Sequence, residues 1–240
     1  MSAAINLVLL PGLNNTQEIW QPLLAHLPSE VNAYALQCPT VDDVDAIADS
    51  LLAELPAQFY LCGFSFGGYV ALSILHRYPQ RVQGLILAGT SAKADSPQQV
   101  EFRRSLIARL QTEDYQQMIN QQASKAFHAD SLLKPELMRI RRSMINNYGA
   151  ERFVAHLQAC IARPDREQVL TDMTIPLLVI SAVEDQVMSM DSQLAMAKLA
   201  KDAELAIIQH SGHLMPLEQP EQFAAALMNW LTNYIGHDPK

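Results

Sequence analysis

The feature that most constrains this chain is the turn sequence Gly63-Phe64-Ser65-Phe66-Gly67, which directly follows the apolar run Phe59–Cys62. An alanine- and leucine-rich segment with helical spacing comes next, so a strand, a tight turn and a helix are expected in succession. Such a turn exposes the serine hydroxyl, and glycines fit beside it because larger side chains would collide with the neighbouring strand and helix. We interpret Ser65 as a candidate nucleophile. The alternative is an ordinary serine in a glycine-rich helix cap, since short matches of this kind also occur by chance.

Apolar runs of strand length alternate with helical patterns on both sides of this turn. The strands are predicted at Ile5–Leu10, Val31–Gln37, Phe59–Phe64, Val82–Ala88, Ile175–Ala182 and Ala203–Gln209. The helices between and after them are predicted at about 17–27, 42–55, 66–78, 189–201 and 220–235. This alternation predicts an α/β fold, with a mostly parallel sheet of about six strands and helices on both faces.

The alternation lapses between the fourth and fifth strands. Residues 91–165 show helical patterns at about 97–111, 113–127, 134–147 and 150–162 and no clear strand. This stretch carries 11 Lys/Arg and 8 Asp/Glu, whereas the rest of the chain carries 6 and 17. We therefore expect residues 1–90 and 166–240 to form the core, and residues 91–165 to form a helical lid (cap) inserted after the fourth strand.

A serine nucleophile needs a base with a pKa near neutrality, and histidine is the first candidate. Five of the seven histidines lie on core helices, in the expected lid or in the C-terminal tail: His26, His76, His128, His156 and His237. The other two, His210 and His213, follow the last strand, where loops of parallel sheets bind ligands. We favour His213, because Gly212 lets the loop turn the imidazole inward, whereas His210 still belongs to the strand end.

The base needs a carboxylate that fixes its tautomer and stabilises the imidazolium. The loop after the fifth predicted strand offers Glu184 and Asp185. We favour Asp185, which lies at the turn, and we assign Asp191, past the turn, to a helix start. The alternative for Asp185 is a carboxylate that only caps the turn.

The tetrahedral intermediate of such a reaction needs backbone N–H donors for its oxyanion. One is expected from Phe66, immediately after the nucleophile. The other is expected from the loop after the first strand, where Leu13 is the best candidate. The two residues would then also contact the substrate, with the Leu13 side chain lining the acyl pocket.

The net charge of −8 argues against a nucleic-acid partner, which needs a basic surface. The three cysteines have no close spacing and fit reduced thiols, and no Cys or His motif indicates a metal or other cofactor. The apolar run Ile5–Leu10 is too short for a membrane span and has no basic region before it. A cytoplasmic enzyme without a membrane partner is therefore expected.

Four segments together resemble the α/β-hydrolase superfamily, in particular its compact, lid-bearing serine esterases. Leu9-Leu10-Pro11-Gly12 is similar to the strand leading to the family's His-Gly, with proline in place of histidine. Gly63–Gly68 resembles the nucleophile elbow, and Val179–Asp185 resembles the acid-bearing strand, with an alanine where glycine is common. Ser211–Leu214, followed by Glu218-Gln219-Pro220-Glu221, resembles the histidine loop and last helix.

The resemblance implies the family's order of functional residues, Ser65, Asp185 and His213. It also implies a strand order of 2-1-3-4-5-6 in this chain's numbering, with the family's N-terminal hairpin missing because only four residues precede Ile5. Many relatives carry an Asp-x-Arg-Gly-x-Gly-x-Ser loop after the next strand. Here Tyr34–Thr40 runs almost directly into a helix, which would leave the pocket more open.

The implied activity is hydrolysis of a carboxylic ester of a small molecule through an acyl-enzyme. Thioesterase, enol-lactonase and C–C bond hydrolase activities use the same triad and stay open, as does a non-catalytic ligand receptor on this fold. Arg139, Arg141 and Arg142 could receive a carboxylate-bearing or carrier-linked substrate. The alternative for these arginines is a solvated helix face.

Overall fold

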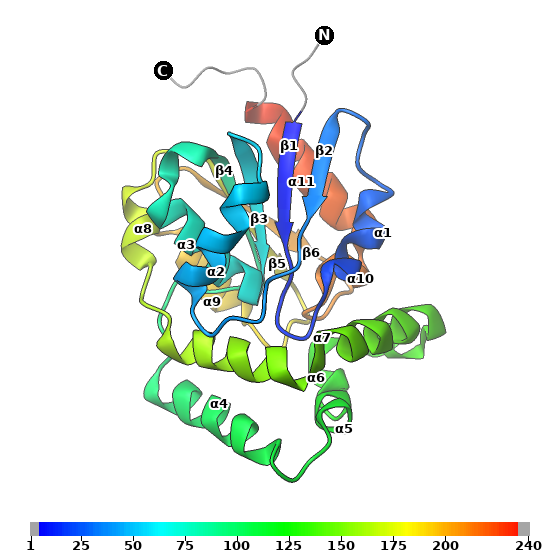
Figure 1. Cartoon of the computed structure of the whole chain (residues 1–240). Helices are drawn as coiled ribbons and strands as arrows, with labels where there is room; N and C mark the ends of the chain where they lie inside the picture. Colours follow the sequence, from blue (N-terminus) through cyan, green and yellow to red (C-terminus); the bar gives the residue numbers. More distant parts are fainter. Residues whose placement is uncertain (1–4, 235–240) are drawn as a thin grey trace.

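The computed structural model describes residues 5–234, and Figure 1 shows a central sheet with helices packed around it. The sheet has six strands in the order β2-β1-β3-β4-β5-β6, and every neighbouring pair is parallel. The strands are β1 (Ile5–Leu10), β2 (Val31–Ala35), β3 (Phe59–Phe64), β4 (Val82–Ala88), β5 (Leu177–Ala182) and β6 (Ala203–Ile208). The predicted fold class and strand order are confirmed.

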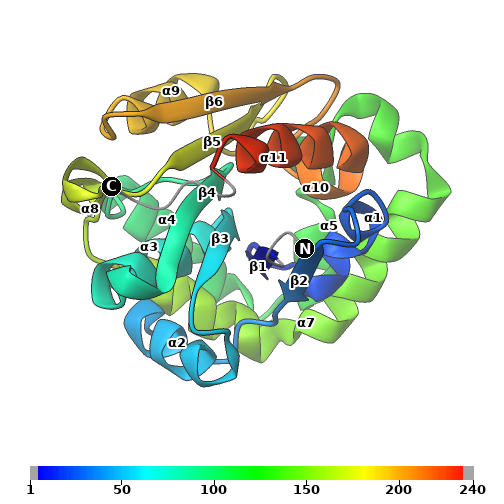
Figure 2. The ribbon, with the colours of Figure 1, turned by 90° about the horizontal axis from the view of Figure 1, so that it is seen from above.

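Apolar side chains from both faces of the sheet are buried under helices. Leu7 and Leu9 belong to one buried cluster and Val8 and Leu10 to the other, as the two-residue period of a strand requires. One face carries α2 (Val44–Leu51), α3 (Phe66–Arg77), α8 (Glu167–Asp172) and α9 (Met190–Ala197). The other carries α1 (Gln21–Leu24), α10 (Met215–Glu218) and α11 (Pro220–Tyr234). Figure 2 shows α2 and α3 on one side of the sheet and α1 and α11 on the other.

Several predicted boundaries change in the structure. The helix expected at 17–27 is a 3-10 turn, Gln17–Trp20, followed by α1, and Thr16 caps it through a side-chain bond to the N–H of Glu18. The helix expected to reach Leu55 consists of α2, for which Asp43 is the N-cap, and a 3-10 turn that follows it at Leu52–Glu54. Helix α8, which lies before β5, was not anticipated. The predicted end of the last helix at residue 235 and the tail 236–240 lie outside the described residues.

Between β4 and β5, four helices form what we call the helical insertion. They are α4 (Pro97–Arg109), α5 (Tyr115–Asn120), α6 (Ala123–Ala126) and α7 (Pro135–Ala162). Figure 1 shows them across the carboxyl ends of the strands. The separate helices predicted at 134–147 and 150–162 follow one another within α7 and meet at Gly149, whose backbone (φ 78°, ψ 160°) is not helical. The helix predicted at 113–127 is divided into α5 and α6.

A buried carboxylate joins the two ends of the insertion. The side chain of Asp95, just before α4, is fully buried and pairs with Arg103 at 2.5 Å and with Arg163 at 2.6 Å. Arg163 lies just after α7 and also donates to the backbone carbonyl of Lys93 at 3.1 Å. A buried carboxylate is costly unless it is paired, and here two guanidinium groups pair with it. The contacts hold the start and the end of the insertion together.

Candidate active site

Ser65 lies at a strained turn between β3 and α3. Its backbone has φ 51° and ψ −115°, a conformation that residues other than glycine rarely adopt. The strain is balanced by fixed contacts, because Ser65 donates its N–H to the carbonyl of Ala88 at 2.9 Å and accepts from the hydroxyl of Thr90 at 2.7 Å. The turn thereby presents a half-buried hydroxyl at the carboxyl end of the sheet.

The close packing of the turn explains the glycines around Ser65. A Cβ added to Gly63 would lie 2.5 Å from the carbonyl oxygen of Gly67 and 2.8 Å from the Cβ of Ala71. A Cβ on Gly12 would lie 3.0 Å from the Cβ of Ser65, so the loop after β1 passes directly beside the serine. Larger residues at Gly63 or Gly12 would displace the turn or the loop.

Ser65, His213 and Asp185 form a continuous hydrogen-bonded series, which we call the triad. Nε2 of His213 lies 3.0 Å from Oγ of Ser65, and Nδ1 lies 2.8 Å from Oδ2 of Asp185. Since the carboxylate only accepts, the proton of neutral His213 lies on Nδ1 and Nε2 can accept from the serine hydroxyl. The other carboxylate oxygen, Oδ1, accepts from the N–H groups of Val187 at 2.7 Å and Met188 at 2.9 Å. These bonds fix the orientation of the Asp185 carboxylate.

The histidine loop packs against the helical insertion. The N–H of His213 donates to the carbonyl of Ala126 at 2.9 Å. A Cβ on Gly212 would lie 2.6 Å from the carbonyl carbon of Phe127, so the glycine permits this close approach. The two alternatives lie outside the triad: the hydrogen bonds to Ser65 and Asp185 belong to His213 rather than His210, and Glu184 accepts from the N–H of Ser211 at 3.1 Å. The structure thus brings together the three residues that the sequence favoured.

The two expected oxyanion donors flank Ser65. Phe66 is the first residue of α3, and Leu13 lies next to Gly12 in the loop after β1. Within residues 5–234, no hydrogen bond engages the backbone N–H of either residue. The loop is fixed from its far side, because the carbonyl of Leu13 accepts from the Asn15 side chain at 2.8 Å. Two free N–H groups beside a candidate nucleophile can stabilise a developing negative charge.

His156 is a buried residue near the site that the sequence did not indicate. It lies on α7, is fully buried, and stacks on the ring of Phe66 with centroids 4.4 Å apart. Its Nε2 donates to the carbonyl of Pro39 at 2.7 Å, so its Nδ1 accepts from the hydroxyl of Tyr148. His156 thereby joins the insertion, the loop after β2 and the residue after Ser65. Only the folded chain brings these segments together, so no local pattern could have revealed the contact.

Burial lowers the pKa of His156 to about 4, because the charged imidazolium is poorly solvated there. In the unfolded chain the same group has an ordinary pKa near 6.5. The free energy of unfolding is therefore unaffected by this group above pH 6.5, and it falls below that pH because the unfolded chain takes up the proton first. We expect about 3 kcal/mol of the free energy of unfolding to be lost as the pH falls from 6.5 to 4. Denaturant titrations of wild type and His156→Gln across this range measure the effect. The variant should show the shallower decline, whereas parallel curves would contradict this account, and His76→Gln, at an exposed histidine, is the control.

The three lid arginines do not form one cluster. Arg141 is buried and donates to the side chain of Asn120 at 2.5 Å and to the carbonyl of Ile119 at 2.8 Å. It therefore joins α7 to α5 and is not available to a ligand at the surface. Arg139 and Arg142 are exposed on α7. Neither the binding surface nor the solvated helix face considered for these arginines fits Arg141, which is buried against α5.

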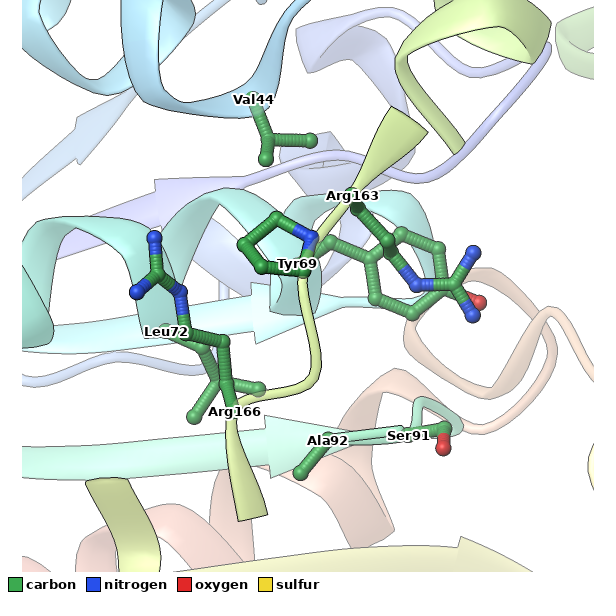
Figure 3. Close-up of a pocket in the computed structure, with 8 residues that line it drawn as sticks. Val44, Tyr69, Leu72, Ser91, Ala92, Arg163 and Arg166 are labelled. Atoms are coloured by element: carbon green, nitrogen blue, oxygen red, sulfur yellow. The ribbon is translucent and has the colours of Figure 1, made fainter. Parts of the chain in front are cut away.

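The cavity in Figure 3 lies beside α3 and does not contain the triad. It is lined by Tyr69, Leu72 and Arg163 among others, and the guanidinium of Arg163 lies 3.9 Å from the centroid of the Tyr69 ring. Its volume of about 10 Å³ fits one water molecule and no substrate. A wider surface groove of about 560 Å³ runs between Thr40–Asp42 and α7, and none of the triad residues lines it.

Among the helices within residues 5–234, none is long and apolar enough to cross a membrane.

Comparisons with known proteins agree on one family. The sequence pattern described as "Alpha/beta hydrolase family" matches residues 7–226. A 2-succinyl-6-hydroxy-2,4-cyclohexadiene-1-carboxylate synthase from Serratia proteamaculans is 28% identical, over 89% of this chain and 84% of its own. A pimeloyl-acyl-carrier-protein methyl ester esterase from Aromatoleum aromaticum is 27% identical, over 92% and 96%. The solved structure of a thermophilic esterase from Thermogutta terrifontis has a TM-score of 0.91 at 26% identity, over 98% of this chain and 92% of that one.

Proposed function

The chain belongs to the alpha/beta hydrolase family, and we propose that it hydrolyses a carboxylic ester of a small molecule through an acyl-enzyme on Ser65. The observation that carries the proposal is the triad geometry, with Nε2 of His213 3.0 Å from the hydroxyl of Ser65 and Nδ1 2.8 Å from the carboxylate of Asp185. The strained backbone of Ser65 supports it, as does the similarity to the esterases from Aromatoleum aromaticum and Thermogutta terrifontis.

The first half of the proposed reaction forms the acyl-enzyme. His213 accepts the hydroxyl proton at Nε2 while Oγ of Ser65 forms a bond to the carbonyl carbon of the ester. The carbonyl oxygen becomes an oxyanion that accepts from the N–H groups of Leu13 and Phe66, and Asp185 stabilises the imidazolium. The C–O bond to the alcohol then breaks, and His213 returns its proton to the leaving alcohol oxygen.

The second half releases the acid. A water molecule takes the place of the alcohol and gives a proton to Nε2 of His213 as its oxygen attacks the acyl carbon. The same two N–H groups, of Leu13 and Phe66, stabilise the second oxyanion. The bond to Oγ of Ser65 then breaks, and His213 returns the proton to the serine. The products are a carboxylic acid and an alcohol, and no cofactor is consumed.

The substrate is proposed to enter beneath the helical insertion. The side chain of Leu13 packs against both the sheet core and the apolar cluster of the insertion, which supports Leu13 as one wall of the proposed acyl pocket. Phe66 contributes its backbone only, since its side chain is buried against His156. The exposed Arg139 and Arg142 are candidates for contact with a carboxylate or an acidic carrier. The three cysteines are buried with free thiols, which fits a reducing compartment such as the cytoplasm.

The test is a substrate panel applied to wild type and Ser65→Ala. We expect hydrolysis of short-chain 4-nitrophenyl esters or aliphatic methyl esters by wild type, and none above background by the variant. Acyl thioesters and enol-lactones belong in the same panel, because the same triad could act on them. A protein that turns over none of these compounds in a Ser65-dependent way would contradict the proposal. Binding of a panel member without turnover would favour a receptor role.

A second candidate follows from the relative of 28% identity, whose name is that of a synthase. In this alternative Ser65 and His213 remove a proton from a carbon atom of the substrate, and no acyl-enzyme forms. Hydrolysis of a C–C bond is another reaction that the same residues could catalyse. Intact-mass analysis after rapid quenching separates the classes, because an ester hydrolase should carry the acyl group on Ser65 during turnover. A turned-over substrate that never leaves an adduct would favour proton abstraction.

A further inference from the structure

Two imidazoles and one carboxylate from distant parts of the chain meet beside the triad without belonging to it. His128 follows α6 in the helical insertion, Glu184 follows β5, and His210 follows β6. One nitrogen of each imidazole and one oxygen of Glu184 all lie within 4.8 Å of one another. The two rings are perpendicular, with centroids 6.1 Å apart. Three metal-ligating side chains therefore converge on one place, where the insertion meets two loops of the core.

Each of the three side chains keeps a ligating atom free. Glu184 accepts through Oε2 from the N–H of Ser211 at 3.1 Å, and no hydrogen bond within residues 5–234 engages its Oε1. His128 accepts through Nδ1 from the N–H of Asp130 at 3.2 Å, and its Nε2 has no hydrogen bond within those residues; Nε2 offers a lone pair once the ring proton moves to Nδ1. Within the same residues, the imidazole of His210 has no hydrogen bond at all. Each of the three side chains therefore has one ligating atom that no other group engages in the described part of the chain.

The backbone places these side chains firmly. His210 has φ 54°, in the left-handed region that is uncommon for residues with a side chain, and its carbonyl accepts from the Gln219 side chain at 2.7 Å. The N–H of His128 donates to the buried carboxylate of Glu218 at 2.8 Å. The direction in which the imidazoles leave the chain is thus set by contacts that do not use their nitrogens.

We propose that His128, Glu184 and His210 form a binding site for a divalent transition-metal ion, with Zn²⁺ as the ion that fits best. Two imidazoles and one carboxylate are a ligand set that Zn²⁺ accepts, whereas Mg²⁺ and Ca²⁺ prefer oxygen ligands throughout. Bonds of about 2.1 Å in a tetrahedron place ligand atoms about 3.4 Å apart, so the side chains must close by about 1.5 Å at most. The exposed side chain of His210 can make this movement, and its exposure leaves a fourth position for water.

The surroundings also favour a cation. Oδ2 of Asp130 lies 3.8 Å from Nδ1 of His128, so this histidine has a second carboxylate near it in addition to Glu184. When Nε2 of His128 binds a metal, the ring proton moves to Nδ1, which gives up its bond from the Asp130 N–H, and a small movement would let the Asp130 carboxylate accept that proton instead. A carboxylate behind a metal-bound histidine is a common arrangement that orients the ring and strengthens the ligand.

An ion at this site would tie together three segments that also hold the triad. Glu184 directly precedes Asp185, His210 lies three residues before His213, and His128 follows the segment whose Ala126 carbonyl accepts from the His213 N–H. Binding would therefore stabilise the contact between the insertion and the two triad loops. The prediction concerns binding and thermal stability, and it holds whichever reaction the triad performs.

The experiment uses the full chain without a polyhistidine tag, since a tag would itself bind zinc. Zn²⁺ is titrated at a pH above 7, because zinc competes with protons for its ligands, and a chromophoric chelator serves as the competitor. We expect one ion per chain and a melting temperature raised by about 5–10 °C when zinc is about 100 times its Kd. His128→Ala, His210→Ala and Glu184→Gln should each weaken binding by at least about 10-fold, because the loss of even an outer-shell partner costs that much.

His76→Ala is the matched control, since this histidine is exposed on α3 and far from the cluster in the sequence. Buried thiols do not compete, because burial raises the pKa of Cys38, Cys62 and Cys160. The metal-free melting temperature of each variant shows whether it folds. The proposal is overturned if binding is weaker than about 1 mM, if none of the three variants weakens it, or if His76→Ala weakens it equally.

Discussion

Replacing Ser65 with alanine should lower kcat for ester hydrolysis by about 10⁶-fold, the scale seen when the serine of such a triad is removed. The substitution deletes the oxygen that forms the acyl-enzyme. His213 and Asp185 keep their mutual hydrogen bond of 2.8 Å, because this bond does not involve the serine hydroxyl. Steady-state kinetics on the best ester of the panel measures the loss. KM should change little, since the hydroxyl contributes to bond formation more than to ground-state binding.

The fold should tolerate this change. Alanine keeps the Cβ. It also keeps both hydrogen bonds that hold the turn, because residue 65 donates its backbone N–H to Ala88 and accepts from the Thr90 hydroxyl through its backbone carbonyl. An unchanged melting temperature therefore accompanies the loss of activity. Ser29→Ala, at an exposed serine, is the matched control and should retain full activity. A Ser65→Ala variant with activity within about 10-fold of wild type would remove Ser65 from the reaction.

Asp185→Asn should lower kcat by about 10⁴-fold while leaving the structure intact. The reason lies in the two N–H groups of Val187 and Met188, which both donate to Oδ1 of Asp185. The asparagine must keep its oxygen at that position, so its NH₂ group takes the place of Oδ2 and faces Nδ1 of His213. Nδ1 then accepts, the ring proton moves to Nε2, and His213 can no longer accept the proton of Ser65.

Two neighbouring carboxylates provide controls for this prediction. Asp191→Asn alters a residue in the first turn of α9, and Glu184→Gln alters the residue next to Asp185. Both variants should retain kcat within about 10-fold, since neither side chain bonds to His213. The comparison is made as pH profiles of kcat/KM, in the absence of added metal. Equal losses in Asp185→Asn and Glu184→Gln would contradict the assignment of the acid.

The parts of this molecule that the sequence predicted are those that depend on local patterns. The strands that lead into the site, β1, β3, β5 and β6, are short apolar runs that end at a glycine, an acidic turn or a polar loop. Their parallel order brings their carboxyl ends to one edge, which is why the sequence alone predicts Ser65, Asp185 and His213 as neighbours. The short spacings in the elbow and the histidine loop limited the choice to a few residues.

The sequence predicts the helical insertion less well than the core, because the helices of the insertion pack mainly on one another. The break at Gly149 is the exception, because its non-helical backbone separates the two helices predicted at 134–147 and 150–162. The sequence pattern places Arg141 at the surface, whereas in the structure it is covered by α5 and donates to residues of that helix. His156 depends on a carbonyl 117 residues away, and the cluster of His128, Glu184 and His210 depends on three loops meeting. Such contacts between distant residues have no local signal.

The most direct test of the central claim is covalent labelling of Ser65 by a fluorophosphonate, followed by intact-mass analysis and peptide mapping. The triad predicts one adduct per chain, located on Ser65, absent in Ser65→Ala and formed much more slowly in Asp185→Asn. No adduct on wild type, or an adduct that maps to a different residue and persists in Ser65→Ala, would contradict the account.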